Sequence, residues 1–137
     1  MAAPKRPPIT CHILDTTTGT PAPNVSVTLT LIEPLKSTSS LISAENTLFI
    51  SQTNSDGRVE SWTTTTASLE ELLSKQDELL WNITFEIGEY YRQKEIRPFF
   101  PKVEIQFITG GEGQEGRSHY HIPLLVGPYS YTTYRGS

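Results

Sequence analysis

Histidine side chains titrate near neutral pH, and two of the three in this chain are spaced to act together. His119 and His121 are separated by one residue, which on a β-strand puts both imidazoles on one face. The pair could bind zinc with His12 as a third ligand, or supply a general base and its hydrogen-bonding partner. It could equally lie on a solvated face, and His12 could simply be satisfied at a sheet edge. The spacing alone leaves these interpretations open.

Two arginines and the end of the chain add further candidates. Arg58 follows the turn sequence at 54–57, where its planar guanidinium could anchor an anionic or carbonyl-rich ligand or only begin a solvated strand. Arg135 has the same ambiguity, beside the carboxylate of Ser137. Ser137 has no base next to it in sequence, so a Ser-His-Asp triad is only weakly indicated. Residues 118–137 hold four of the six tyrosines and two of the three histidines, and we expect this end to be held in place as part of a site.

Composition narrows the class of protein. The 137 residues fit one domain, 9–137, after a disordered lead-in at 1–8. A net charge of −4 without a basic stripe argues against nucleic acid as a partner, and no apolar run is long enough for a membrane span. The first eight residues have no apolar stretch typical of a secretory signal, and the lone Cys11 cannot form an internal disulfide. We therefore expect an intracellular protein that is not secreted.

Alternating apolar residues predict short strands between turn signals. In the first of them, Ile9, Cys11 and Ile13 would share one face, and Thr10, His12 and Leu14 the other. The expected strands are residues 9–14, 25–32, 47–53, 59–65, 79–87, 103–107, 122–126 and 129–134.

Helices and loops complete the pattern. A capping box, Ser68 to Glu71, predicts a short helix at 69–78, and a second short helix is expected at 89–95. Residues 35–46 and 109–117 are predicted to be hairpin loops. Seven or eight strands with one or two short helices indicate an all-β fold, an antiparallel β-sandwich.

Four stretches together carry a resemblance. They are ITCHILDTTTGTPAPNVSVTL near the start, TNSDGRV in the middle, then RPFFPKVEIQF, and HYHIPLLVGPYSYTTYRGS at the end. In this combination the chain resembles the 5-hydroxyisourate hydrolases, the transthyretin-like proteins of urate degradation. The closing YRGS is the most specific of these motifs, because the hormone-carrier branch of the same fold lacks it.

The resemblance implies a site and a reaction. By position, the family's catalytic residues fall on His12, Arg58 and His121, and its C-terminal substrate-binding residues fall on Tyr134, Arg135 and Ser137. It implies hydrolysis of 5-hydroxyisourate to 2-oxo-4-hydroxy-4-carboxy-5-ureidoimidazoline, without metal or cofactor. It also implies a homotetramer, a dimer of dimers, with the site at a subunit interface. Because the family's pathway is peroxisomal in many eukaryotes, the expected location is cytoplasmic or peroxisomal.

The resemblance also leaves questions open. The role of His119 is unassigned, and the loops 35–46 and 109–117 are longer than is usual in the family. Gly127 and Ser130 replace other small residues in a turn. The alternative function is a small-ligand carrier or interaction module with the same fold and no catalysis. A zinc hydrolase built on the histidine pair is a third interpretation.

Overall fold

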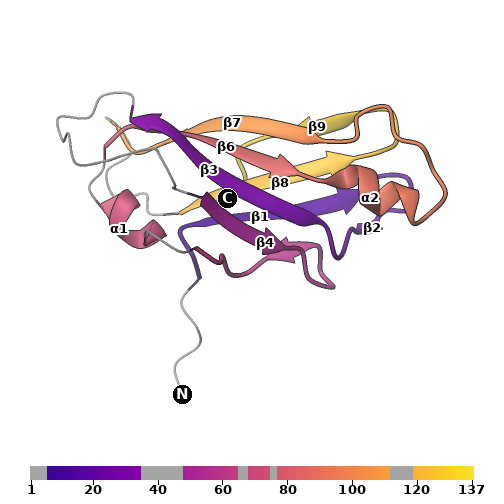
Figure 1. Ribbon diagram of the computed structural model, residues 1–137, viewed down its shortest axis with the longest axis horizontal. Helices are drawn as coiled ribbons and strands as arrows, with labels where there is room; N and C mark the ends of the chain where they lie inside the picture. Colours follow the sequence, from indigo (N-terminus) through magenta and orange to yellow (C-terminus); the bar gives the residue numbers. More distant parts are fainter. Residues whose placement is uncertain (1–5, 35–47, 65–67, 75–76, 112–118) are drawn as a thin grey trace, which may run out of the picture.

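Two β-sheets pack face to face in the computed structural model, with two short helices beside them (Figure 1). The structure describes residues 6–34, 48–64, 68–74, 77–111 and 119–137. The described part contains nine strands, of which two are only two residues long. The predicted all-β sandwich with short helices is thus confirmed.

The first sheet carries most of the candidate residues. Its path runs β2 (Thr20–Pro21), β1 (Ile9–Asp15), β8 (Tyr120–Val126) and β9 (Tyr131–Thr133), and β5 (Arg58–Val59) also pairs with β1. The pairing of β1 with β8 is parallel, whereas the other pairs are antiparallel. The sandwich is therefore not antiparallel throughout, because its first and eighth strands run side by side in the same direction.

The second sheet has the order β4 (Leu48–Gln52), β3 (Ser26–Pro34), β6 (Leu79–Phe85) and β7 (Val103–Thr109), all antiparallel. The helices are α1 (Leu69–Ser74) and α2 (Ile87–Arg92). Among the described residues, no helix is long and apolar enough to cross a membrane.

The core lies between the sheets and follows the period-two patterns of the strands. Ile9, Cys11 and Ile13 of β1 are fully buried, as their shared face predicted. They meet apolar side chains of the second sheet, with Trp81 of β6 as the largest. Its indole Nε1 donates a hydrogen bond of 2.7 Å to Thr109 Oγ1, so the polar edge of this buried ring is satisfied.

Several predicted boundaries were wrong for identifiable reasons. The strand expected at 59–65 pairs with β1 only at Arg58–Val59, because the chain then crosses to the other sheet, where Thr63 bridges Ile50. The strand expected at 79–87 ends at Phe85, and Ile87 reaches the same core from the first turn of α2. That helix ends before the predicted residue 95, since Glu95 has a positive φ of 60°.

The predicted loops and lead-in also differ. Residues 109–117 do not join a hairpin, because β7 and β8 belong to different sheets. Residues 35–46 do connect hydrogen-bonded neighbours, β3 and β4, but lie outside the described residues. Helix α1 is described over 69–74, residues 75–76 lie outside the described residues, and residues 77–78 of the predicted 69–78 are not helical. Of the lead-in predicted to be disordered over 1–8, residues 6–8 are described, and the Pro8 carbonyl accepts a hydrogen bond from Tyr120 N.

The turn at 54–57 fixes the start of β5. Asn54 Oδ1 accepts hydrogen bonds from the backbone N–H groups of Asp56 and Arg58, as the turn sequence predicted. Gly57 has a φ of +71°, and a Cβ atom there would lie 2.6 Å from the Ile13 carbonyl oxygen of β1. Glycine therefore allows the backbone of the turn to approach β1 closely, which brings Arg58 beside His12.

Replacing Gly57 by alanine tests this close approach. Gly19 is the matched control, because it has a similar φ of +69° but nothing within 4 Å of the added Cβ. We expect Gly19→Ala to cost about 1–2 kcal/mol for the left-handed backbone alone. Gly57→Ala should cost a further ~1–3 kcal/mol for the overlap. Urea denaturation measures both, and equal losses in the two variants would contradict the account.

Candidate active site

A hydrogen-bonded group of histidines lies across β1 and β8. In the parallel register, Thr10 is directly opposite His121, so side chains of alternate residues meet on the outer face of the sheet. Thr10 Oγ1 lies 2.7 Å from His121 Nδ1 and 3.0 Å from His119 Nε2. His121 Nε2 lies 2.7 Å from His12 Nδ1. The prediction that His119 and His121 share a face is confirmed, and His12 joins them from the neighbouring strand.

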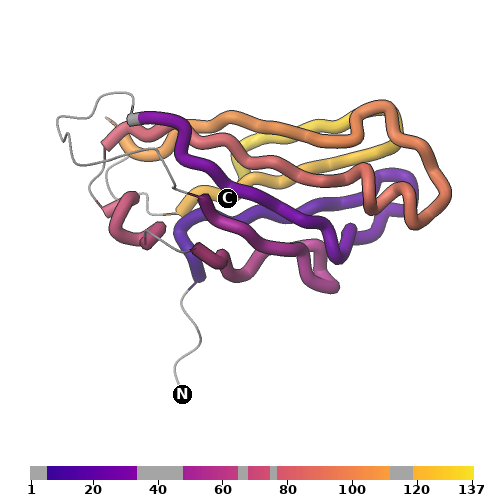
Figure 2. Tube along the Cα trace, in the orientation of Figure 1, coloured from indigo at the N-terminus to yellow at the C-terminus, as the bar shows by residue number. Residues whose placement is uncertain are grey.

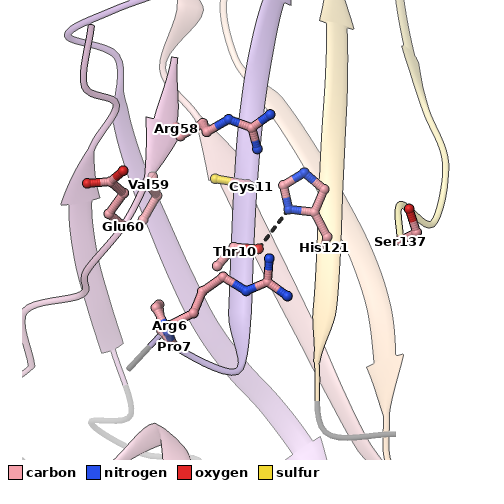
Figure 3. A pocket seen from close by; sticks show the side chains of 9 residues that line it. All are labelled: Arg6, Pro7, Thr10, Cys11, Arg58, Val59, Glu60, His121 and Ser137. Atoms are coloured by element: carbon pink, nitrogen blue, oxygen red, sulfur yellow. Dashed lines mark hydrogen bonds between the residues drawn. The ribbon is translucent and has the colours of Figure 1, made fainter. Parts of the chain in front are cut away.

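Arginine side chains and the chain end border this group. A cavity of about 440 Å³ is lined by nine residues. They are Arg6, Pro7, Thr10, Cys11, Arg58, Val59, Glu60, His121 and Ser137. Figure 3 shows the guanidinium groups of Arg6 and Arg58 extending toward His121 from the opposite side to Ser137. The volume is in the range of small-molecule sites.

The surroundings keep the imidazoles neutral. Burial, followed by the positive charges nearby, lowers the pKa of His121 to about 4. Burial and then the Arg58 charge lower the pKa of His12. The pKa of His119 is also lowered, first by burial and then by Arg6. At neutral pH these histidines are therefore uncharged and able to accept a proton.

The last residues are fixed against His121. Gly136 N donates a hydrogen bond of 2.9 Å to the His121 carbonyl, so the chain end lies alongside β8 (Figure 2). A Cβ atom on Gly136 would come within 2.7 Å of the His121 ring, so the tail approaches this closely only because residue 136 is glycine. The expectation that this end is held in place is confirmed.

The structure separates the residues predicted from YRGS. Ser137 lines the larger cavity with Arg58 and His121, whereas Tyr134 and Arg135 line a second cavity of about 240 Å³. The Arg135 guanidinium lies 4.9 Å from the centre of the Tyr120 ring. Because His121 borders both cavities, the two sets meet at this one side chain.

Two residues of the site were missed from the sequence. Arg6 lies in the segment predicted to be disordered, and Thr10 had no signal beyond its place beside Cys11 and His12. A basic residue close before the first strand could have indicated Arg6. The role of Thr10 depends on its partner in β8, which local sequence does not reveal.

The site offers no activated cysteine nucleophile. Burial raises the pKa of the Cys11 thiol, so it is held in the protonated, unreactive form. Both nitrogens of His121, Nδ1 of His12 and Nε2 of His119 are directed at one another or at Thr10. In the part of the chain that is described, no three His, Cys, Asp or Glu side chains are grouped so that they could hold a metal ion.

The sequence matches a known family along almost its whole length. A family model described as the HIUase/Transthyretin family matches residues 9–136. The chain is 37% identical to a "Probable 5-hydroxyisourate hydrolase" of Schizosaccharomyces pombe, over 98% of this chain and 94% of that protein.

Solved structures agree with the fold. A 5-hydroxyisourate hydrolase of Klebsiella pneumoniae is 26% identical with a TM-score of 0.66, over 94% of this chain and 97% of that one. Transthyretin from Sparus aurata is 23% identical with a TM-score of 0.69, over 96% of this chain and 97% of that one, which supports the fold alone.

Titration of the histidines by NMR tests the electrostatics. We expect His121 to titrate near pH 4 and His12 below the usual 6.5. Arg58→Gln removes a positive charge that disfavours imidazolium, so both pKa values should rise. Arg92→Gln is a matched control, because Arg92 pairs with Glu89 on α2. Unchanged histidine pKa values in Arg58→Gln would contradict this cause.

Proposed function

The chain belongs to the HIUase/Transthyretin family, and on that basis we propose that it hydrolyses 5-hydroxyisourate. The observation that carries the proposal is the 2.7 Å hydrogen bond between His12 and His121, adjacent to Arg58. The relatives from Schizosaccharomyces pombe and Klebsiella pneumoniae are both named as hydrolases of this substrate. No feature of the site favours the alternative of a carrier without catalysis.

Water activation is assigned to the histidine pair. We propose that His12 and His121 jointly position a water molecule and remove its proton, a role typically worth about 10²–10⁴-fold in rate. Their lowered pKa values keep them unprotonated at neutral pH. The water oxygen attacks a ring carbonyl carbon, the ring C–N bond breaks, and the departing nitrogen receives a proton. This hydrolysis opens the six-membered ring.

Charge stabilisation is assigned to the arginines. Attack on the carbonyl puts negative charge on its oxygen, and a fixed guanidinium nearby lowers the energy of that state. Arg58 is the first candidate, because it is the cross-strand neighbour of His12. Arg6 lines the same cavity and is proposed to bind another substrate carbonyl, with Ser137 as a hydrogen-bonding wall.

The remaining tail residues receive a narrower role. Tyr134 and Arg135 line the second cavity, where the stacking of Arg135 on Tyr120 supports the backbone that leads to Gly136. In this proposal they contribute to substrate binding through the position of the tail. The mechanism is proposed to need no metal, because neutral imidazoles and guanidinium groups supply both the base and the positive charge.

Alanine substitutions test the assignment. The decay of freshly prepared 5-hydroxyisourate is followed in the ultraviolet for the wild type and for His12→Ala, Arg58→Ala and His121→Ala. Each variant should lose about 10²-fold or more in kcat/KM, because each removes part of the base or the positive charge. Arg92→Ala, on the exposed face of α2, is the control for a lost surface arginine.

Two results would overturn the proposal. One is a near-wild-type rate of 5-hydroxyisourate decay in all three site variants, equal to the rate of the Arg92→Ala control. The other is loss of activity on adding a chelator with recovery on adding zinc, which would favour a metal hydrolase instead.

The oligomeric state is part of the proposal. We propose a homotetramer, a dimer of dimers with the site at a subunit interface, in line with the family resemblance. Exposed aromatic and aliphatic side chains support an interface at the free sheet edges, with Ile108 at 50% and Tyr131 at 39% exposure. Sedimentation equilibrium should give four times the chain mass of 15.3 kDa. A monomer at assay concentrations would contradict it.

A further inference from the structure

Four side chains form one continuous hydrogen-bonded series: two on β1, one on β8 and one on the residue just before β8. It runs from His119 Nε2 to Thr10 Oγ1, from there to His121 Nδ1, and from His121 Nε2 to His12 Nδ1. Thr10 and His121 are buried, with 6% and 9% of their surface exposed. Of these four side chains, only His12 and His121 take part in the proposed water activation. Thr10 and His119 have no assigned role in it.

The donor in each of the three hydrogen bonds determines the donor in the next. A neutral imidazole has one N–H, so a ring that donates from one nitrogen must accept at the other. If His121 donates from Nδ1 to Thr10, its Nε2 accepts from His12 Nδ1, and His12 Nε2 is left with a free lone pair. If Thr10 instead donates to His121, the order reverses and the proton of His12 lies on Nε2. Only the first order leaves His12 a base.

The surroundings of His119, at one end of the hydrogen-bonded series, select between the two proton orders. The His119 ring contacts Thr10 through Nε2, and the nearby backbone of Pro7 acts on this ring as a hydrogen-bond acceptor that raises its pKa. In the proposed order, the single N–H of neutral His119 faces Pro7 from the other ring nitrogen, and Nε2 accepts the Thr10 hydroxyl proton. The Thr10 oxygen is left to accept from His121 Nδ1, which is the first order.

Each imidazole carries a single N–H only if it is uncharged. Arg6 and Arg58 line the cavity beside the chain, and both positive charges act against an imidazolium at His121. Glu60 is the acidic side chain lining that cavity. Among the described residues, His12 makes no hydrogen bond except the one through Nδ1. His12 Nε2 is therefore the nitrogen at the open end of the hydrogen-bonded series.

We propose that Thr10 and His119 are positioning residues that hold His121 and His12 in their Nδ1-protonated tautomers, so that His12 Nε2 is the nitrogen that takes the proton from water. The donor-to-acceptor order of the hydrogen bonds is set at His119, and the Thr10 hydroxyl transmits it to His121 and His12. The consequence for rate rests on the proposed hydrolase function, whereas the proton positions do not.

NMR of ¹⁵N-labelled histidines tests the proton positions without substrate. Long-range ¹H–¹⁵N spectra report which ring nitrogen carries the proton. In the wild type we expect Nδ1 to be protonated in both His12 and His121. Thr10→Val keeps the shape and removes the hydroxyl, so His121 should become a mixture of tautomers, and His12 with it. Thr10→Ser keeps the hydroxyl and should retain the wild-type order.

Kinetics provide the second readout. In Thr10→Val, kcat should fall about 10- to 100-fold with little change in KM, as part of the ~10²–10⁴-fold from general-base catalysis. Thr10→Ser should recover most of the loss. His119→Gln, whose carbonyl can accept the hydroxyl proton, should be more active than His119→Phe. Thr18→Val, in the exposed turn after β1, is the control for losing a threonine hydroxyl.

The outcomes separate the two proposals. A wild-type His12 protonated on Nε2, or wild-type tautomers and kcat in Thr10→Val, would overturn this inference. Thermal unfolding checks that each variant is folded, and Thr10→Ser keeps the test valid if Thr10→Val is not. If the wild type does not hydrolyse 5-hydroxyisourate but shows the expected tautomers, the proposed function fails and the proton order stands.

Discussion

The parallel pairing of β1 with β8 is the constraint on which the rest of the site depends. Its register sets Thr10 opposite His121, and His12 is the next residue of β1 on the same face of the sheet. A slip of one residue would turn one row of side chains to the other face, exchanging the histidines for core residues. The buried face of β1, formed by Ile9, Cys11 and Ile13, therefore fixes the geometry of the histidine group as well as the fold.

The other side of β1 adds the positive charge. The turn before β5 makes Arg58 the cross-strand partner of His12, and Arg6 reaches the same cavity from the segment before β1. This positive field has two effects that work together. It adds to burial in keeping the imidazoles neutral, and it would stabilise the oxyanion of a carbonyl under attack. A base of lowered pKa is intrinsically weaker, and stabilisation of the anion it helps to form offsets that loss.

Local patterns predicted the parts of the fold that depend on neighbours in sequence. The alternation in β1, the turn at Asn54–Gly57 and the shared face of the histidine pair all follow from residues a few positions apart. The pairing of Thr10 with His121 joins residues 111 positions apart, so no local pattern could reveal the hydrogen-bonded chain. The same limit explains the hairpin wrongly expected at 109–117, since β7 and β8 lie in different sheets. The family resemblance supplied His12, Arg58 and His121, but it left His119 unassigned and did not include Arg6 or Thr10.

The central claim is that a neutral, hydrogen-bonded histidine pair acts as the base in hydrolysis. The pH dependence of kcat/KM for 5-hydroxyisourate tests it most directly. A base is lost as the pH falls through its pKa, and the pKa values of His12 and His121 are lowered from 6.5. The account therefore predicts a plateau through neutral pH and an acid limb with an apparent pKa below 6.5. An acid limb with an apparent pKa at or above 6.5, or a rate that stays constant as the pH falls from 6.5 to below about 4, would contradict it.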